Sequence, residues 1–294
     1  MNYKAVISNQ ETRFKVLHIL RFISDRQMLK LQYWIKTKRS LNLKNPQRYS
    51  EKIQWYKLNY RNPKMQVCAD KYLVRQYIID HGLKDILIPI YGVYNHYSDI
   101  DFSKLPQKFV MKTTNGSGTN YLCHNKNQLD YSKLALTFEK WLQRDIFAAA
   151  REWSYEGLQP KIITEAFLED NKYSSISDYK FFCFNGKVAY IFVDIDRVDN
   201  HRRNVYDADW NFIDVTIDHP NFGDNLLKPE GLKEMKNIAS KLANDFPAVR
   251  IDLYWVNHQV YFGEMTFYPF SGYINFTPDN FDFTLGKKFI LPNN

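Results

Sequence analysis

The stretch that decides the fold is VRIDLYWVNHQVYFGEMTF, residues 249–267. Polar and apolar residues alternate on both sides of its centre, and side chains alternate between the two faces of a strand, so the stretch predicts a β-hairpin. A turn centred on His258 places Asp252 directly opposite Glu264, with the two Cβ atoms about 4.5–5.5 Å apart. The hairpin therefore brings two carboxylates together on one face.

Two facing carboxylates repel each other unless a cation offsets their charge. Oxygen ligands select magnesium or manganese over zinc, so Asp252 and Glu264 are predicted metal ligands. Arg250 shares their face and is a candidate catalytic group, because a guanidinium can orient a carboxylate or stabilise a phosphoryl group during transfer. The alternative is a solvated polar face on which the two carboxylates point apart.

A candidate phosphate site lies further towards the N-terminus. A predicted strand ends at Lys112, and the loop 113–120 follows it with Gly116, Ser117 and Gly118. Glycines let the backbone approach phosphates closely, and Lys112 adds positive charge. The loop is neither a Walker A motif nor a Rossmann fingerprint, and an ordinary hairpin loop remains the alternative.

Two further pairs of charged residues lie on predicted strands. Asp178 and Lys180 alternate with aromatic residues ahead of Asn185–Gly186, a turn pair that strongly predicts a hairpin. A surface salt bridge is the alternative interpretation of this acid and base. Asp194 and Asp196 form a D-x-D motif, which occurs in nucleotide-sugar glycosyltransferases but also on exposed strand faces.

The N-terminal region, residues 1–60, is expected to be helical and basic, because apolar residues recur at helical spacing among lysines and arginines. Its apolar face either packs on the rest of the protein or lies on an anionic membrane surface. A smaller lobe is expected at residues 61–168, and a larger lobe with the metal site at residues 169–294. This order of elements predicts a mixed fold of the α/β (α+β) class.

Composition narrows the classes of function. The chain has 294 residues, a net charge of +8 and three cysteines. The charge favours anionic partners, but no nucleic-acid-binding signature accompanies it, so no nucleic acid partner is expected. No spacing of His or Cys predicts a zinc site, and the sequence shows neither a signal peptide nor a membrane-spanning stretch. The expected location is the cytoplasm, with peripheral contact at the inner face of the membrane through the N-terminal helices as an option.

Four words of the sequence together resemble the TupA-like ATP-grasp family, which is associated with the biosynthesis of teichuronopeptide and other exopolysaccharides. The words are YSEKIQW (49–55), FVMK (109–112), DYKFFCFNG (178–186) and GEMTFYP (263–269). The resemblance extends over about residues 41–292. It implies an ATP-grasp fold, in which two α/β lobes hold a nucleotide between them.

The resemblance implies roles for residues of the smaller lobe. Lys71 and Lys112 would bind the phosphates of ATP, and the glycine loop would close over them. Glu165, Phe167 and Leu168 would meet the adenine.

Residues of the larger lobe also receive roles from the resemblance. Asp178 would bind the ribose, with Lys180 as a further nucleotide-binding residue. Asp252 and Glu264 would hold one or two magnesium ions. Thr266 takes the position of the family's usual asparagine and is the third expected metal ligand.

The implied reaction joins a carboxylate to an amine. The carboxylate attacks the γ-phosphate of ATP to give an acylphosphate and ADP, and the amine then displaces phosphate to form an amide. Lys112 and Arg250 are the expected catalytic residues. The acid is expected to be a uronic acid of a capsular polysaccharide or exopolysaccharide, or of its precursor, and the amine an amino acid or other amine. The alternatives are a nucleotide-sugar glycosyltransferase and a non-catalytic glycan-binding module.

Overall fold

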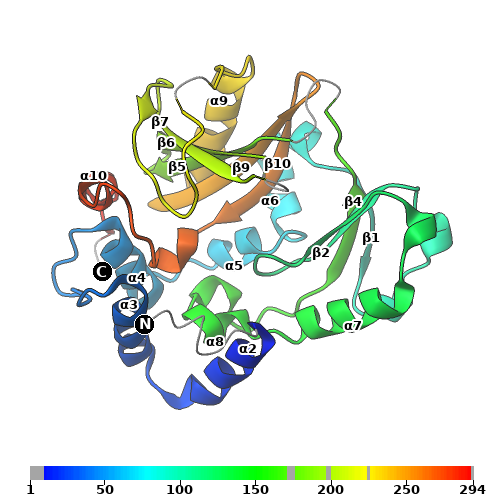
Figure 1. Ribbon diagram of the computed structural model, residues 1–294, viewed down its shortest axis with the longest axis horizontal. Coiled ribbons are helices and arrows are strands. Elements are labelled where there is room, and N and C mark those ends of the chain that lie inside the picture. The colour runs from blue at the N-terminus through cyan, green and yellow to red at the C-terminus, as the bar shows by residue number, and fades with distance from the viewer. Residues whose placement is uncertain (1–9, 171–175, 197–199, 224–225, 293–294) are drawn as a thin grey trace. The chain divides into compact units, whose positions relative to one another are not determined.

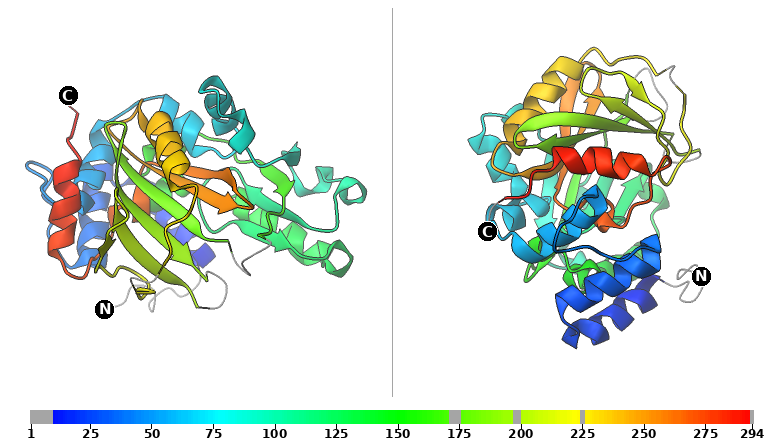
Figure 2. Two further views of the ribbon diagram at one scale, coloured as in Figure 1. Left: turned by 90° about the horizontal axis from the view of Figure 1, so that it is seen from above. Right: turned by 90° about the vertical axis from the view of Figure 1, so that its left-hand side faces the viewer.

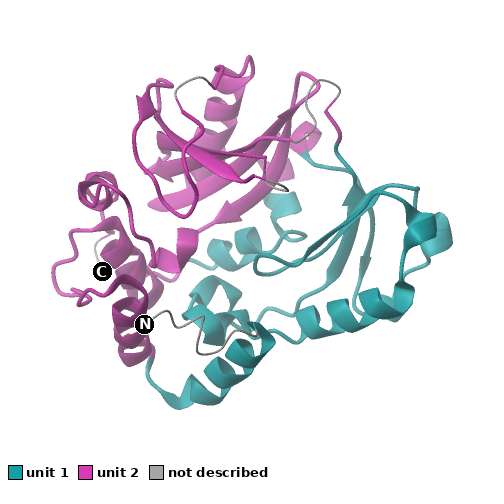
Figure 3. Cartoon of the chain, viewed as in Figure 1, with its two compact units in different colours: residues 1–24, 62–77, 87–168 teal, residues 25–61, 78–86, 169–294 magenta. Residues whose placement is uncertain are grey.

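The computed structural model describes residues 10–170, 176–196, 200–223 and 226–292. The chain forms two compact units: unit 1 comprises residues 1–24, 62–77 and 87–168, and unit 2 comprises residues 25–61, 78–86 and 169–294 (Figure 3). These units group the chain differently from the three continuous segments expected at 1–60, 61–168 and 169–294. Among the described residues, no helix has both the length and the apolar character needed to cross a membrane.

The N-terminal region divides between the two units because its helices pack differently. Helix α2 (Gln10–Ile19) contacts α8 (Ile146–Ala150) in unit 1 and has no buried residue of its own. Helix α3 (Asp25–Thr37) instead buries an apolar face in unit 2, where Leu29 and Tyr33 form a small core. The structure therefore shows that the apolar face of α3 packs on the rest of unit 2.

Unit 1 is built on a four-stranded antiparallel sheet with the order β1-β4-β2-β3 (Figure 1). The strands are β1 (Ile90–Tyr94), β2 (Phe109–Thr113), β3 (Asn120–Cys123) and β4 (Ile162–Ala166). Helix α7 (Tyr131–Leu142) shares a core with this sheet, in which Leu134 and Phe138 join Phe109 and Met111. Strands β2 and β3 form the hairpin that the glycine loop predicts.

Two short helices, α5 (Lys64–Ala69) and α6 (Val74–Asp80), precede this sheet in the chain. Asp70 lies between them and accepts hydrogen bonds from the backbone N–H groups of Tyr72 and Leu73 at 2.8 and 2.9 Å. A side chain that bonds the backbone two and three residues ahead stabilises a turn. This turn carries Lys71.

Unit 2 is built on a six-stranded antiparallel sheet with the order β10-β9-β5-β6-β7-β8. The strands are β5 (Asp178–Phe184), β6 (Lys187–Ile195), β7 (Arg202–Asp207), β8 (Phe212–Ile213), β9 (Ala248–Val256) and β10 (Gln259–Thr266). The turn between β5 and β6 is the predicted Asn185–Gly186 pair, with φ of 49° and 72°. This part of the prediction is confirmed.

Helices cover both faces of the larger sheet. Helix α9 (Leu232–Ala243) packs on β5, β6 and β9, where the Sγ of Cys183 lies 3.9 Å from the carbonyl oxygen of Ala239. Helices α4 (Tyr49–Asn59) and α10 (Asn280–Lys288) lie on the other side (Figure 2). There the ring of Tyr49 lies 6.1 Å from those of Phe182 and Phe184. Charged residues occupy the rest of that face.

Candidate active site

The β9–β10 hairpin pairs the two predicted metal-binding acids. A two-residue turn, Asn257–His258, closes the hairpin, and its register would, if continued, set Asp252 opposite Gly263. A bulge after Phe262 shifts the pairing by one residue, so that Asp252 faces Glu264. The expected pairing is confirmed, but it depends on the bulge and not on the centre of the turn.

Arg250 joins these two acids. Its Nε donates to Oδ1 of Asp252 at 2.6 Å, and its Nη2 donates both to Oδ2 of Asp252 at 2.7 Å and to Oε1 of Glu264 at 2.9 Å. The hydroxyl of Thr266 donates to the same Oε1 at 3.2 Å. Burial by itself lowers the pKa of Arg250, but the charge of Asp252 raises that pKa above its usual value. One positive group thus already holds the two acids together.

Lys180 extends this charged face to the neighbouring strands. Its Nζ forms ion pairs with Asp178 and with Asp252, the latter at 2.9 Å, and lies 3.6 Å from Oδ2 of Asp194. Burial lowers the pKa of Lys180, but Asp178 and Asp252 raise it above its usual value. The side chains of Lys180 and Asp178 are only 8% and 3% exposed, so the alternative of a surface salt bridge is wrong.

Asp194 has its own cationic partner on strand β7. Arg203 binds it through two hydrogen bonds, from Nε at 2.5 Å and from Nη2 at 3.0 Å, and the Nε2 of His201 lies 3.1 Å from the same carboxylate. Burial raises the pKa of Asp194, but Arg203 and Lys180 outweigh burial and hold that pKa well below its usual range. The motifs did not point to Arg203 or His201. The pairing of β6 with β7 sets Arg203 opposite Asp194, and His201 comes directly before β7.

These residues form one charged network across five strands of the larger sheet. Its members are Asp178, Lys180, Asp194, Arg203, Arg250, Asp252 and Glu264. Buried ion pairs are costly to form and are retained where they position groups or serve a reaction. The charged network is therefore the candidate active-site face of unit 2.

In unit 1, one predicted phosphate-binding residue contacts one predicted adenine-binding residue. Lys112 on β2 forms an ion pair with Glu165 on the adjacent strand β4. Phe167, just beyond β4, packs edge-on against the ring of His124, with 4.9 Å between ring centroids. Leu168 follows and is half-buried. His124 was not predicted, and its isolated position in the sequence gave no signal.

The glycine loop has the backbone geometry that its sequence predicts. Gly116 and Gly118 have φ of +67° and +69°, which disfavours other residues, and Ser117 between them is exposed. The Nζ of Lys71 donates to the carbonyl oxygen of Gly116 at 2.6 Å, and its backbone N–H donates to that of Thr114 at 2.8 Å. Lys71 thus contacts the loop through both its backbone and its side chain.

The donor atoms fit a hard divalent cation. The Oδ2 of Asp252 and the Oε1 of Glu264 converge on a single atom, the Nη2 of Arg250, and both are oxygens. Within the described ranges no three His, Cys, Asp or Glu side chains are arranged to hold a metal ion. Magnesium is commonly bound by one or two carboxylates together with phosphate oxygens of the substrate. Two acids beside a phosphate would therefore suffice.

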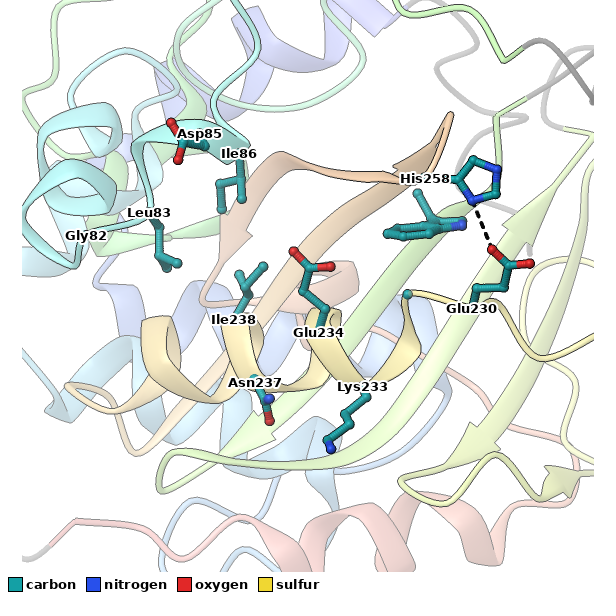
Figure 4. Close-up of a pocket in the computed structure, with 12 residues that line it drawn as sticks. Gly82, Leu83, Asp85, Ile86, Glu230, Lys233, Glu234, Asn237, Ile238 and His258 are labelled. Atoms are coloured by element: carbon teal, nitrogen blue, oxygen red, sulfur yellow. Dashed lines mark hydrogen bonds and ion pairs between the residues drawn. The ribbon is translucent and has the colours of Figure 1, made fainter.

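A separate pocket of about 650 Å³ in unit 2 lies away from the charged network. It is lined by α9, by residues 82, 83, 85 and 86 and by the tip of the β9–β10 hairpin, where His258 Nδ1 lies 2.9 Å from Glu230 Oε2 (Figure 4). Glu234 and Ile238 of α9 also line it (Figure 4). None of the predicted site residues lies in this lining, so the pocket is not the candidate active site.

The comparison with models of protein families gives a match over most of the chain. The TupA-like ATPgrasp family model matches residues 51–290. No curated protein has significant similarity to the sequence.

Three solved structures illustrate the more distant similarities. D-alanine–D-alanine ligase from Bacillus anthracis has 19% identity, with 68% of this chain and 57% of that chain covered and a TM-score of 0.43. The same enzyme from Helicobacter pylori has 16% identity, coverage of 77% and 62%, and a TM-score of 0.41. The ATP-grasp ligase PsnB, complexed with minimal precursor, has 12% identity, coverage of 74% and 59%, and a TM-score of 0.40. The chain spans less than two thirds of the length of each of these structures.

Proposed function

The chain belongs to the TupA-like ATP-grasp family, and we propose that it uses ATP and a divalent cation to join a carboxylate to an amine. The product would be an amide, formed through an acylphosphate. The magnesium ion, when bound, would neutralise charge on the phosphate oxygens.

The observation that carries this proposal is the shared contact of two acids. Asp252 and Glu264 come from different strands, and both reach the Nη2 of Arg250. Like charges directly opposite each other destabilise a sheet unless a cation lies between them. Two acids that already share one cationic partner are suited to bind a metal ion. The hydroxyl of Thr266 lies beside Glu264 and is the third proposed ligand.

We assign the phosphates of ATP to residues of unit 1. Lys71 and Lys112 would supply positive charge, and the loop with Gly116, Ser117 and Gly118 would supply backbone N–H donors. In this structure Lys71 contacts the carbonyl oxygen of Gly116, and Lys112 forms an ion pair with Glu165. Bound phosphates would compete with these groups for the two lysines. Catalysis would consist mainly of positioning and charge stabilisation, because phosphoryl transfer needs no covalent nucleophile from the protein.

The remaining assignments concern the rest of the nucleotide and the reacting acid. The ribose of ATP would be contacted by Asp178 and Lys180. The adenine would be contacted by Glu165 and residues 167–168. Arg250 would stabilise negative charge on the reacting carboxylate. Its guanidinium already makes contacts of this kind with two carboxylates of the protein.

We further propose that the acid is a uronic acid of a surface polysaccharide or its precursor, and that the amine is an amino acid. The net charge of +8 favours an acidic saccharide over a neutral one. The protein would work in the cytoplasm. Contact with an anionic membrane would use the exposed side of α3, where Leu31 and Trp34 are 46% and 56% exposed.

The glycosyltransferase alternative has less support from the D-x-D motif. Asp194 is 1% exposed and is held by two hydrogen bonds from Arg203. Asp196 lies beyond the end of β6 with a φ of 51°, so the two acids do not continue one regular strand face. To bind the metal ion of a nucleotide sugar, Asp194 would have to break its hydrogen bonds with Arg203.

One incubation distinguishes the candidate functions. The protein is mixed with ATP, magnesium, glucuronic or galacturonic acid and a mixture of amino acids, and ADP and phosphate are measured. We expect release that requires both the acid and the amine. Release of a nucleoside diphosphate only from a nucleotide sugar would favour the glycosyltransferase, and glycan binding without any turnover would favour the non-catalytic module.

A further inference from the structure

The chain makes a left-handed turn shortly after the predicted metal ligands of β10. Phe270 and Ser271 both have φ of 54° and ψ of 20°, and Gly272 has φ of 64°. Residues other than glycine adopt this conformation at a cost in free energy, and it persists only where the surroundings enforce it. Such strain is concentrated at functional sites.

Helix α4 enforces this turn through two buried donors. The Nε2 of Gln54 and the Nζ of Lys57 both donate to the carbonyl oxygen of Ser271, each at 2.9 Å. Lys57 is 1% exposed, and its Nζ also lies 4.7 Å from the ring centroid of Tyr273. A positive charge is costly to bury, so the contact of Lys57 with the carbonyl of this turn indicates a specific role.

The turn also lies unusually close to α4. A Cβ atom added to Gly272 would lie 2.4 Å from the Nε2 of Gln54 and 2.6 Å from the Cγ2 of Ile53. Only glycine therefore satisfies both the positive φ and the close approach at this position.

The turn presents an aromatic ring to the charged network. The ring centroid of Phe270 lies 5.1 Å from the Cζ of Arg203, a distance at which a ring face attracts a guanidinium. Arg203 in turn holds Asp194, which lies 3.6 Å from Lys180, and Lys180 contacts Asp252. A continuous series of contacts thus runs from α4 through the turn to a predicted metal ligand.

We propose that Gln54 and Lys57 are positioning residues, which hold the left-handed turn so that Phe270 fixes Arg203 and, through it, the charged network. This inference rests on the proposed function, because the network matters to turnover only if it is the active-site face. The proposed reaction gives no role to the YSEKIQW motif. This inference assigns one to Gln54 within the motif and to Lys57 just after it. Neither residue touches the reacting atoms.

The structure offers a matched control on the same helix. Lys52 also lies on α4 and also donates to backbone carbonyls, those of Gly286 and Phe289, at 2.9 and 2.8 Å. Its partners belong to α10 and the residue that follows it, and not to the turn. Lys57→Met and Lys52→Met therefore both remove a lysine–carbonyl contact of α4, but only the first loosens the turn.

Two measurements on these variants test the proposal. In the incubation with ATP, magnesium, uronic acid and amino acids, Lys57→Met should lower kcat by about 10- to 100-fold, the range expected when a reacting group is misplaced. Lys52→Met should change kcat less than about threefold at a temperature at which both variants are folded. Loss of kcat in both variants in proportion to their loss of thermal stability would show a purely structural role and would overturn the proposal.

Hydrogen exchange tests the turn without any assumption about turnover. The amides of Ser271 and Tyr273 donate to the carbonyl oxygens of Tyr268 and Phe270 at 2.8 and 3.0 Å. These amides should exchange faster in Lys57→Met than in Lys52→Met. Equal exchange rates would overturn the proposal whatever the kinetics show.

Two further results distinguish failure of this proposal from failure of the proposed function. Gln54→Leu removes the second, uncharged donor, and it should reproduce both effects more weakly if Lys57→Met does not fold. If the wild-type protein releases no ADP in any mixture, the proposed function fails, and faster exchange in Lys57→Met would still support the hold of α4 on the turn.

Discussion

At the scale of single residues, the proposed chemistry depends on the arrangement around Asp252. Its carboxylate is 2% exposed, and burial raises its pKa above the usual value, whereas Arg250 and Lys180 act to lower that pKa. The two cations stabilise the charged form, which a metal ion requires of its ligand. Loss of this one negative charge should therefore lower turnover, and it should also reduce stability, because the buried cations Arg250 and Lys180 would lose a shared partner.

We predict that Asp252→Asn and Glu264→Gln each lower the rate of ADP formation at least about 100-fold, because each substitution removes a charged metal ligand. Thermal unfolding followed by circular dichroism should show that both variants remain folded. Glu230→Gln is the control, since Glu230 is a largely exposed acid of unit 2 and contacts only His258 among the interactions described above. Wild-type rates in both active-site variants would contradict the metal assignment.

Asp194 gives a prediction about pH. Its pKa in the folded protein lies below the usual 3.8, so the unfolded chain takes up this proton first as the pH falls. The stability that Asp194 contributes is therefore present above pH 3.8 and is lost as the pH falls through the folded-state pKa. Urea unfolding of the wild type between about pH 5 and pH 2 should show this loss.

The variant Asp194→Asn should lose less stability over the same pH range. It should also be less stable than the wild type near pH 7, by about 3–5 kcal/mol, because Arg203 would be left without its buried partner. Identical pH dependence of the wild type and the variant would refute the low pKa.

At the scale of secondary-structure elements, the bulge in β10 is the feature that pairs Glu264 with Asp252. Gly263 lies within it, and a Cβ atom added there would lie 3.0 Å from the carbonyl oxygen of Asp252. A larger side chain must push the two strands apart where the two acids face each other. The bulge therefore links the geometry of the hairpin to the predicted metal site.

Substitution of Gly263 should produce a graded effect. Gly263→Ala is expected to reduce turnover mildly, and Gly263→Val more strongly, with a loss of about 1–3 kcal/mol of stability from crowding. Turnover and urea unfolding of the two variants measure both quantities. Full activity of Gly263→Val would show that the register of the acids is not critical.

The elements also show which features the sequence makes predictable. Asn185–Gly186 and the alternation around residue 257 predicted their hairpins, because turn chemistry and strand periodicity are local. The bulge was not predicted, since it follows from the way two strands adapt to each other. Arg203 was missed for a related reason: its pairing with Asp194 depends on the register of β6 and β7.

At the scale of the whole molecule, the grouping of the chain was the least predictable feature. The N-terminal region has one continuous helical pattern, yet residues up to 24 belong to unit 1 and those from 25 to unit 2. Sequence periodicity identifies an apolar face but not the surface on which it packs. The ATP-grasp family, by contrast, was evident from four short words that are far apart in the chain.

Nucleotide binding should stabilise the folded protein. Ligand at about 100 times its Kd adds about 2.7 kcal/mol of stability, which raises the melting temperature by a few degrees. We expect this shift with ATP and magnesium in the wild type, and a much smaller shift in Lys112→Met. Lys108→Met, at an exposed lysine just before the same strand, should behave like the wild type. Equal shifts in all three proteins would contradict the role of Lys112.

A crystal structure with a non-hydrolysable ATP analogue and magnesium tests the metal site most directly. We expect at least one magnesium ion about 2.0–2.1 Å from carboxylate oxygens of both Asp252 and Glu264, and also bound to phosphate oxygens of the analogue. Analogue bound elsewhere in the protein, with both carboxylates still in contact with Arg250 and with no metal ion on them, would contradict the assignment of this face as an active site.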